Sequence, residues 1–198
     1  MDEFVIKDRK KLRKGYTTGT CAAAAAGSAA QALLTGSTVD TAAVDTPSGK
    51  ILMIPVRQTV LGDGWARSSV VKDSGDDPDV TDGITVYATV SLADEDIVIE
   101  GGLGVGRVTK PGLACDVGMA AINPVPREMI RAQVLSAAEE WEYSGGFYIE
   151  RSGPKGVSLA KQTFNPNLGI EGGISILGTS GIVEPMSEQA LIDTIKVE

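Results

Sequence analysis

The chain of 198 residues contains no histidine and only two cysteines, Cys21 and Cys115. Histidine and cysteine are the usual ligands of protein-bound zinc, so we expect no protein-bound metal. Two cysteines are also too few for a disulfide scaffold. A cysteine nucleophile needs a neighbouring base, usually histidine, so catalysis by Cys21 is disfavoured.

Long apolar runs are absent as well. Hydrophobic residues make up 42% and charged residues 22% of the chain, as in ordinary globular proteins. No run approaches the roughly 20 apolar residues of a membrane span. The basic N-terminus before an alanine-rich segment imitates a secretory signal, but residues 17–20 are polar, and Asp2, Glu3 and Asp8 stand where a signal needs positive charge. We expect a cytoplasmic protein with no membrane partner.

The net charge of -8 argues against a nucleic-acid partner. Residues 21–100 carry four basic and twelve acidic side chains, which account for all of it. The first twenty residues hold six basic against three acidic side chains, and residues 101–170 hold seven against six. An acidic ligand would therefore bind to one of these last two regions.

Hydrophobic periodicity predicts two long helices. The first is alanine-rich, covers residues 20–34 and ends at Gly36; the second covers residues 126–143. Strands are predicted at residues 39–45, 51–60, 65–72, 84–92, 147–150 and 174–177. Strands in adjacent runs with few helices favour an α+β fold, with a mixed or antiparallel sheet packed against both helices. We expect one domain over residues 1–186, and a helix over 187–198 that leads into an α/β domain missing from this chain.

The segment Lys14-Gly15-Tyr16-Thr17-Thr18-Gly19-Thr20-Cys21 runs directly into the alanines. If Thr18 or Thr20 caps the helix, the unpaired N–H groups of the first turn form an anion site. Lys14 adds positive charge beside it, and Thr17 a further hydroxyl group. The alternative is a well-capped core helix whose alanines allow close packing.

This segment and four others resemble the CbiD family, the cobalt-precorrin-5B C1-methyltransferases of anaerobic cobalamin biosynthesis. The other segments are residues 72–83 (KDSGDDPDVTDG), 104–112 (GVGRVTKPG), 123–127 (NPVPR) and 173–181 (GISILGTSG). The resemblance covers residues 13–198 and corresponds to the N-terminal part of the family. It implies methyl transfer from S-adenosylmethionine to C1 of cobalt-precorrin-5B, giving cobalt-precorrin-6A. It also implies an acidic tetrapyrrole substrate that carries its own cobalt.

Five aspartates crowd ten residues: Asp73, Asp76, Asp77, Asp79 and Asp82. Their spacing does not match an EF-hand calcium loop. One hypothesis is that Asp76, Asp77 or Asp79 manages a proton on the macrocycle and is catalytic. The alternative is a set of tight turns, which Asp-Pro and Gly-Asp pairs favour.

The glycine-rich segment 101–106 follows an apolar run, as in loops that bind S-adenosylmethionine or dinucleotides. Such loops open into a helix, whereas Lys110-Pro111-Gly112 follows here, so cofactor binding at this loop is disfavoured. Arg107 and Lys110 could instead bind carboxylates, and Arg127 could clamp an acetate or propionate arm. Solvated turns and an exposed helix face are the alternatives. The sequence locates no methyl-donor site.

Two other functions stay open. One is a noncatalytic tetrapyrrole-binding or partner-binding domain of a truncated CbiD relative, because no methyl-donor loop is recognisable. The other is a general anion-binding domain, which rests only on the helix start at residues 17–20.

Overall fold

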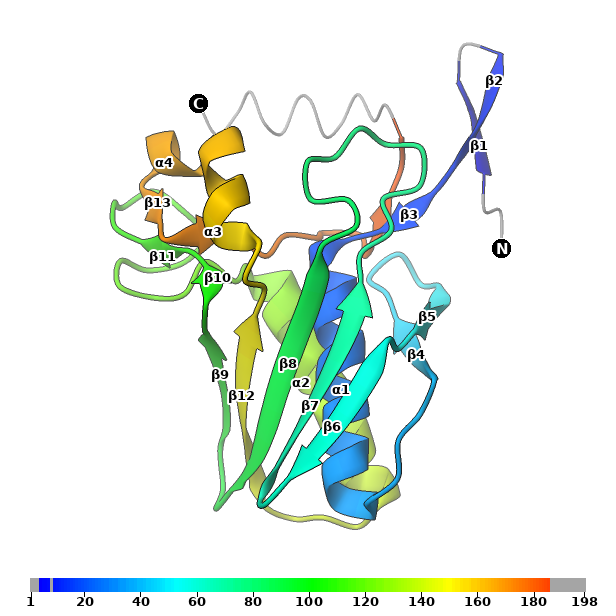
Figure 1. Ribbon diagram of the computed structural model, residues 1–198, viewed down its shortest axis with the longest axis vertical. Helices are drawn as coiled ribbons and strands as arrows, with labels where there is room; N and C mark the ends of the chain where they lie inside the picture. The colour runs from blue at the N-terminus through cyan, green and yellow to red at the C-terminus, as the bar shows by residue number, and fades with distance from the viewer. Residues whose placement is uncertain (1–3, 8, 186–198) are drawn as a thin grey trace.

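The computed structural model describes residues 4–7 and 9–185 (Figure 1). The helix predicted over residues 187–198 lies outside this part of the chain. Of the helices that are described, none is long and apolar enough to cross a membrane.

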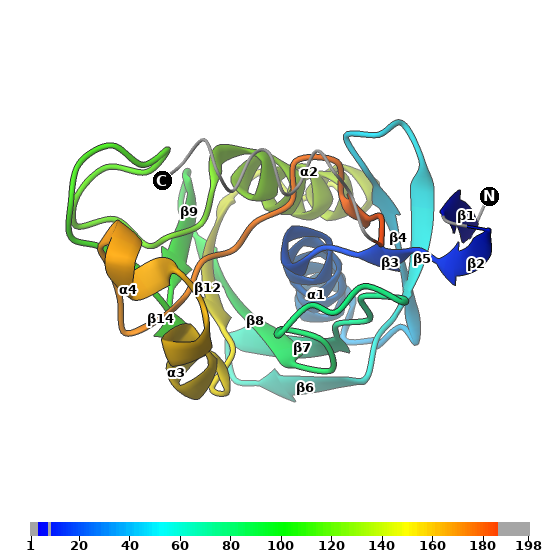
Figure 2. The ribbon, with the colours of Figure 1, turned by 90° about the horizontal axis from the view of Figure 1, so that it is seen from above.

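The centre of the fold is a five-stranded mixed sheet with the strand order β6-β7-β8-β12-β9. Its strands are β6 (Gln58–Gly62), β7 (Trp65–Val71), β8 (Thr85–Ala93), β9 (Ile97–Gly101) and β12 (Gly146–Ser152). All neighbours pair antiparallel except β12 and β9, which are parallel. Both long helices, α1 (Thr18–Thr35) and α2 (Pro124–Glu140), cover one face of the sheet (Figure 2). The α+β class is confirmed.

The alanine-rich helix α1 is the centre of the core. Thr17 is its N-cap, since its side chain accepts a hydrogen bond from the Thr20 N–H. This corrects the prediction of a cap at Thr18 or Thr20, because Thr18 already lies inside the helix. Gly36 ends the helix in the left-handed conformation, with φ of 72°, which glycine adopts without steric cost. Cys21 and the alanines that follow it, Ala22 to Ala26, are fully buried.

Small side chains let α1 and α2 pack closely. Gly19 of α1 lies against Pro126 of α2. Further toward the C-terminal end of both helices, Gly27 lies against Gln133. The two helices therefore run in the same direction, and both begin at the same end of the molecule.

The predicted strand 51–60 is wrong as a single element. It is divided into β5 (Ile51–Pro55), which pairs with β4 (Thr41–Asp45), and β6, which pairs with β7 in the main sheet. Pro55 has no N–H to continue a ladder, and the chain changes sheets after it. Of the strand predicted at 174–177, only Ile174 lies in a strand.

The remaining elements are short. They are β1 (Phe4–Lys7), β2 (Lys10–Arg13), β3 (Gly15–Tyr16), β10 (Gly104–Val105), β11 (Arg107–Val108), α3 (Gly156–Leu159), η1 (Ala160–Gln162), α4 (Asn165–Leu168), β13 (Ile170–Glu171), β14 (Gly173–Ile174) and β15 (Ile182–Val183). Apart from the β1–β2 hairpin, which projects sideways, they lie at the end of the sheet where α1 and α2 begin (Figure 1).

Candidate functional site

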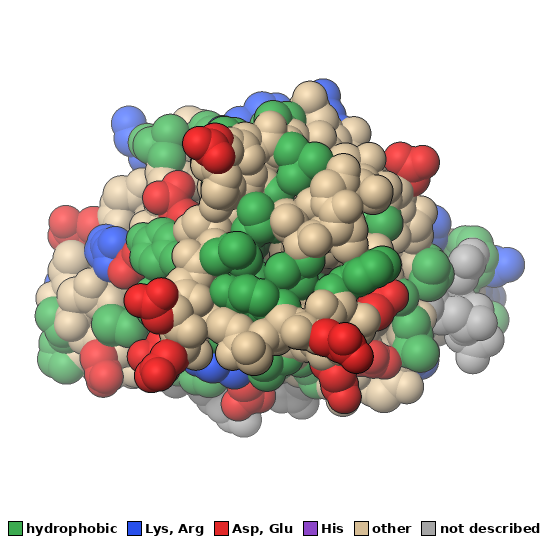
Figure 3. All heavy atoms as spheres, turned by 90° about the horizontal axis from the view of Figure 1, so that it is seen from below, with side chains coloured by type: hydrophobic (Ala, Val, Ile, Leu, Met, Phe, Trp, Pro, Cys, Tyr) green, Lys and Arg blue, Asp and Glu red, His purple; other side chains and the backbone are tan. Residues whose placement is uncertain are grey.

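The segments that the sequence singled out lie at one end of the molecule, the upper end in Figure 1. The start of α1, the loop after β7, β10 and β11, and the start of α2 all belong to this end. At the opposite end, hydrophobic side chains gather with acidic side chains around them (Figure 3). An acidic ligand is better accommodated at the upper end.

Most hydrogen-bonding groups in the first turn of α1 have partners within the protein. The Gly19 N–H donates to the carbonyl of Leu177 at 2.9 Å, and the Thr20 hydroxyl donates to the carbonyl of Gly181 at 2.7 Å. Residues 177–181 thus cover the helix start (Figure 2). In the described part of the chain, only Thr18 among the predicted threonines makes no hydrogen bond with its N–H or hydroxyl. Of the predicted threonines, Thr18 is therefore the one whose donors remain available to an anion in the described structure.

The aspartate-rich loop is attached to Arg13, the last residue of β2. Arg13 binds Asp73 through two guanidinium nitrogens, at 2.6 and 2.7 Å. The backbones of Arg13 and Asp76 are also joined, and the Asp76 carboxylate accepts the Arg13 N–H at 2.6 Å. The hydrogen bond from Arg13 holds the pKa of Asp73 below its ordinary value. Asp73 and Asp76 therefore fix the loop in place.

Asp79 is paired with a buried cation, Lys72. The Lys72 ammonium, 2% exposed, donates to Asp79 at 2.6 Å and also to Ser74. Burial alone would raise the pKa of Asp79, but Lys72 and the two hydrogen bonds from Thr81 outweigh it and lower the pKa. A carboxylate with a lowered pKa is a weak proton acceptor. Asp77 lies in the same loop, and its N–H donates to the Ser74 carbonyl.

Arg127 uses its guanidinium to join three segments. Its nitrogens donate to the carbonyls of Ile122, Ile99 and Ala120 at 2.8, 2.9 and 3.2 Å. This network holds the start of α2 against β9. A ligand carboxylate would have to compete with these backbone carbonyls.

The other predicted cations lie apart from one another. Lys14 forms an ion pair with Glu184 at 2.6 Å. Arg107 forms one with Glu100 at 3.0 Å, and Lys110 is exposed, with its stem against Gly169. The structure therefore brings these residues to one end of the fold without joining them in a single pocket.

The glycines of segment 101–106 pack against protein atoms. A Cβ on Gly102 would meet the Glu150 side chain at 2.7 Å, and one on Gly106 would meet the Ile170 side chain at 2.3 Å. No helix follows: β11 comes next. These glycines serve close packing of the chain, and the segment has none of the geometry of a nucleotide-binding loop.

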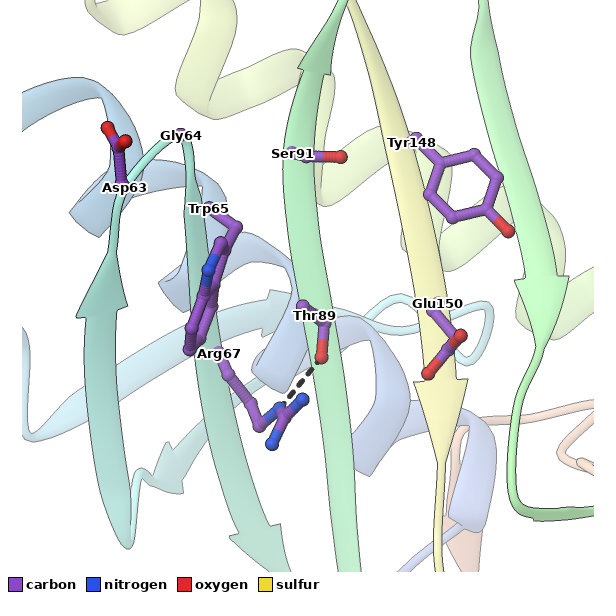
Figure 4. A pocket seen from close by; sticks show the side chains of 8 residues that line it. All are labelled: Asp63, Gly64, Trp65, Arg67, Thr89, Ser91, Tyr148 and Glu150. Carbon is purple, nitrogen blue, oxygen red and sulfur yellow. Dashed lines mark hydrogen bonds between the residues drawn. The ribbon is translucent and has the colours of Figure 1, made fainter.

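One further depression, of about 480 Å³, lies on the sheet face away from the helices (Figure 4). Trp65, Arg67, Tyr148 and Glu150 contribute to its lining. Arg67 lies 5.5 Å from the Trp65 ring centre and donates to Thr89 at 2.9 Å. Its cation is thus already engaged. Among the described residues, no three histidine, cysteine, aspartate or glutamate side chains are grouped as for a metal.

Arg151 is a buried charged residue that was not among the predicted site residues. It lies on β12 and is fully buried, and none of its guanidinium nitrogens has a hydrogen-bond partner among the described residues. The sequence does carry a signal that Arg151 faces inward. Along a strand every second side chain lies on the same face, so Arg151 shares the face of the apolar residues Phe147 and Ile149.

Comparison with known proteins decides the family. The CbiD family model matches residues 5–185. The chain belongs to the CbiD family. It is 54% identical over its whole length to a cobalt-precorrin-5B C(1)-methyltransferase of Ruminiclostridium cellulolyticum, and 51% identical to one of Treponema denticola. The expected resemblance is confirmed.

The CbiD fold is also found in a crystal structure. The cobalamin biosynthesis protein CbiD of Archaeoglobus fulgidus superimposes with a TM-score of 0.71 and 36% identity, over 98% of this chain and 62% of that one. The chain spans about half the length of the curated relatives: 52% of the Ruminiclostridium protein and 54% of the Treponema protein. The match is to the N-terminal part of CbiD.

Proposed function

We propose that this protein methylates C1 of cobalt-precorrin-5B, with S-adenosylmethionine as methyl donor, to give cobalt-precorrin-6A in cobalamin biosynthesis. The observation that supports this most is the 54% identity, over the whole chain, to a relative that carries this activity in its name. A cytoplasmic location fits a biosynthetic enzyme with two free cysteines. The cobalt belongs to the substrate.

The chemistry asks mainly for alignment. The sulfonium of the donor is already activated, so the protein must place sulfur, methyl group and ring carbon in line and exclude water. The upper end of the fold suits an acidic tetrapyrrole because several cations lie there. Proposed substrate contacts are Lys14, Thr17, Thr18, Thr20, Arg107, Lys110 and Arg127. Of these, Thr18 and the exposed Lys110 are the best supported by the structure.

The three aspartates Asp76, Asp77 and Asp79 are proposed as alternatives for handling a proton on the macrocycle. Asp79 is paired with Lys72, and Asp76 fixes the loop to Arg13. If one of them is catalytic, its replacement by asparagine should slow methyl transfer, as measured by turnover at saturating donor. Unchanged turnover in folded Asp76→Asn, Asp77→Asn and Asp79→Asn variants would remove this role.

A second candidate function is a noncatalytic tetrapyrrole-binding or partner-binding domain. It is favoured by the packed glycines of segment 101–106, which resemble no donor loop. This proposal includes the expected domain, which covers residues 1–186.

Binding of S-adenosylhomocysteine separates the two functions. This product occupies a methyl-donor site without reacting, and it can be titrated into the folded protein by calorimetry. Micromolar affinity, on the order of -8 kcal/mol, supports the methyltransferase. Absence of binding, with retained tetrapyrrole binding, supports the noncatalytic domain.

A further inference from the structure

Arg151 stands near the upper end of β12, on the sheet face that packs against the helices. Its exposed fraction is 0%, and it is the largest fully buried side chain among the described residues. Its partners across the ladder are small residues, Ala88 on β8 and Gly101 on β9. The arginine is therefore flanked by short side chains on both neighbouring strands.

No acceptor meets this guanidinium. In the described part of the chain, Nε, Nη1 and Nη2 of Arg151 are all without a hydrogen bond. An ionised group buried in this way is strongly unfavourable unless an anion or several oxygens compensate it. The protein satisfies its other inward-facing cations: Lys72 has Asp79 and Ser74, and Arg127 has three carbonyls. Arg151 is the exception among the described residues.

Neighbouring groups do not supply the missing charge. The ionisable side chain that interacts with Arg151 is Cys21, whose pKa is raised by burial to about 12, so the thiol is neutral at pH 7. Burial lowers the pKa of Arg151 to about 10, and the guanidinium is still charged at pH 7. Within the described part of the chain, the positive charge of Arg151 is thus uncompensated.

Helix α1 covers the sheet face on which Arg151 is buried, and its first turn offers further donors (Figure 2). Thr18 lies three residues before Cys21, so both share a face of the helix. Its N–H and hydroxyl make no hydrogen bond within the described residues, and it stands at the positive end of the helix. Thr18 is 6% exposed, so the site comes close to the surface at this point.

We propose that Arg151, with Thr18, binds a carboxylate of the ligand. A guanidinium holds a carboxylate through two parallel hydrogen bonds, which suits a fork buried without acceptors. The inference rests on the proposed function, because both of its reactants carry carboxylates: the amino-acid part of the methyl donor and the side chains of the tetrapyrrole. A bound carboxylate would compensate the buried positive charge and so remove the free-energy cost of burying it.

The test uses calorimetry on the protein and three variants. Arg151→Met removes the charge and keeps much of the volume, whereas Arg151→Lys keeps the charge and loses the fork. Arg57→Met is the matched control, since Arg57 is exposed and outside the site. The ligands form two pairs: S-adenosylhomocysteine with methylthioadenosine, which lacks the carboxylate, and cobyrinic acid with cobinamide, whose carboxylates are amides.

We expect Arg151→Met to weaken binding of one carboxylate-bearing ligand about 10- to 100-fold. Its partner without the carboxylate should bind the parent and the variant equally, and Arg57→Met should behave as the parent. The ligand that responds identifies the source of the carboxylate. If Arg151→Met does not fold, Arg151→Lys should show a loss in the same ligand.

Two results would overturn the inference. If the parent binds these ligands and the Arg151 variants bind them equally well, the carboxylate site is wrong while the proposed function stands. If the folded parent binds none of them, both fail together. Thermal melting separates a structural role from a binding role. If Arg151 is structural, Arg151→Met should have a lower melting temperature than the parent. If Arg151 is a binding residue with an unpaired charge, the melting temperature should not fall.

Discussion

Arg151 lowers stability so that its charge can meet a ligand. Because its pKa falls from 12.5 to about 10 on folding, the unfolded chain binds this proton more tightly, and the folded state is penalised at every pH below 10. Removal of the charge in Arg151→Met should therefore raise the free energy of unfolding at pH 7, by about 1 to 4 kcal/mol. Urea denaturation measures this, with Arg57→Met expected to be neutral. A destabilised Arg151→Met would contradict the account.

Asp79 has the opposite effect, because its charge is paired with Lys72. Its pKa is lowered from 3.8 on folding, so the stabilisation is complete above pH 3.8 and is lost as the pH falls through the folded-state pKa. Asp79→Asn leaves Lys72 buried without a carboxylate and should cost about 3 kcal/mol at pH 7. Urea denaturation at a series of pH values should show this difference shrinking below pH 3.8. Asp94→Asn, in an exposed turn, is the control; an equal loss there would contradict the pairing.

The sequence could reveal which side chains carry charge but not what they meet. Strand alternation identifies Arg151 as inward-facing, because Phe147 and Ile149 share its face. It cannot reveal that Asp73 binds Arg13, sixty residues earlier, or that Arg127 donates to Ile99. These contacts depend on how distant segments come together, which local pattern does not encode.

The two long helices approach each other at two glycines with different neighbours. A Cβ on Gly19 would meet the Pro126 ring at 2.9 Å and the Leu177 carbonyl at 3.1 Å, and neither can turn away. At Gly27 the nearest atom, at 2.8 Å, is the flexible end of Gln133. Gly19→Ala should therefore cost about 1 to 3 kcal/mol of stability and Gly27→Ala less, because alanine also favours the helix there. Thermal melting checks this; equal melting temperatures would contradict the close packing at Gly19.

Helices and central strands were predictable because hydrophobic periodicity fixes them. The alanine-rich helix begins two residues before its predicted start, at Thr18, because the cap is Thr17. Strands β7 and β8 match their predicted ranges within one residue. The short elements at the upper end were missed. Two-residue strands such as β10 and β11 are too short for any period, and their pairing depends on the remote strands β13 and β14.

The molecule as a whole joins two parallel helices, one mixed sheet and an end built from loops. The order of the predicted strands and helices indicated the α+β class, and the CbiD resemblance predicted the family. The parallel pairing of β12 with β9 was not predictable, because the long connection through α2 brings β12 back between β8 and the edge strand β9. The upper end gathers the candidate residues because both helices begin there.

Methyl transfer by this chain tests the central claim most directly. The folded protein would be incubated with cobalt-precorrin-5B and S-adenosylmethionine whose methyl group is isotopically labelled, and the tetrapyrrole would be analysed by mass spectrometry and NMR. The account predicts one labelled methyl group at C1, with less product from Arg151→Met than from Arg57→Met. Unlabelled tetrapyrrole after incubation with folded protein would contradict it.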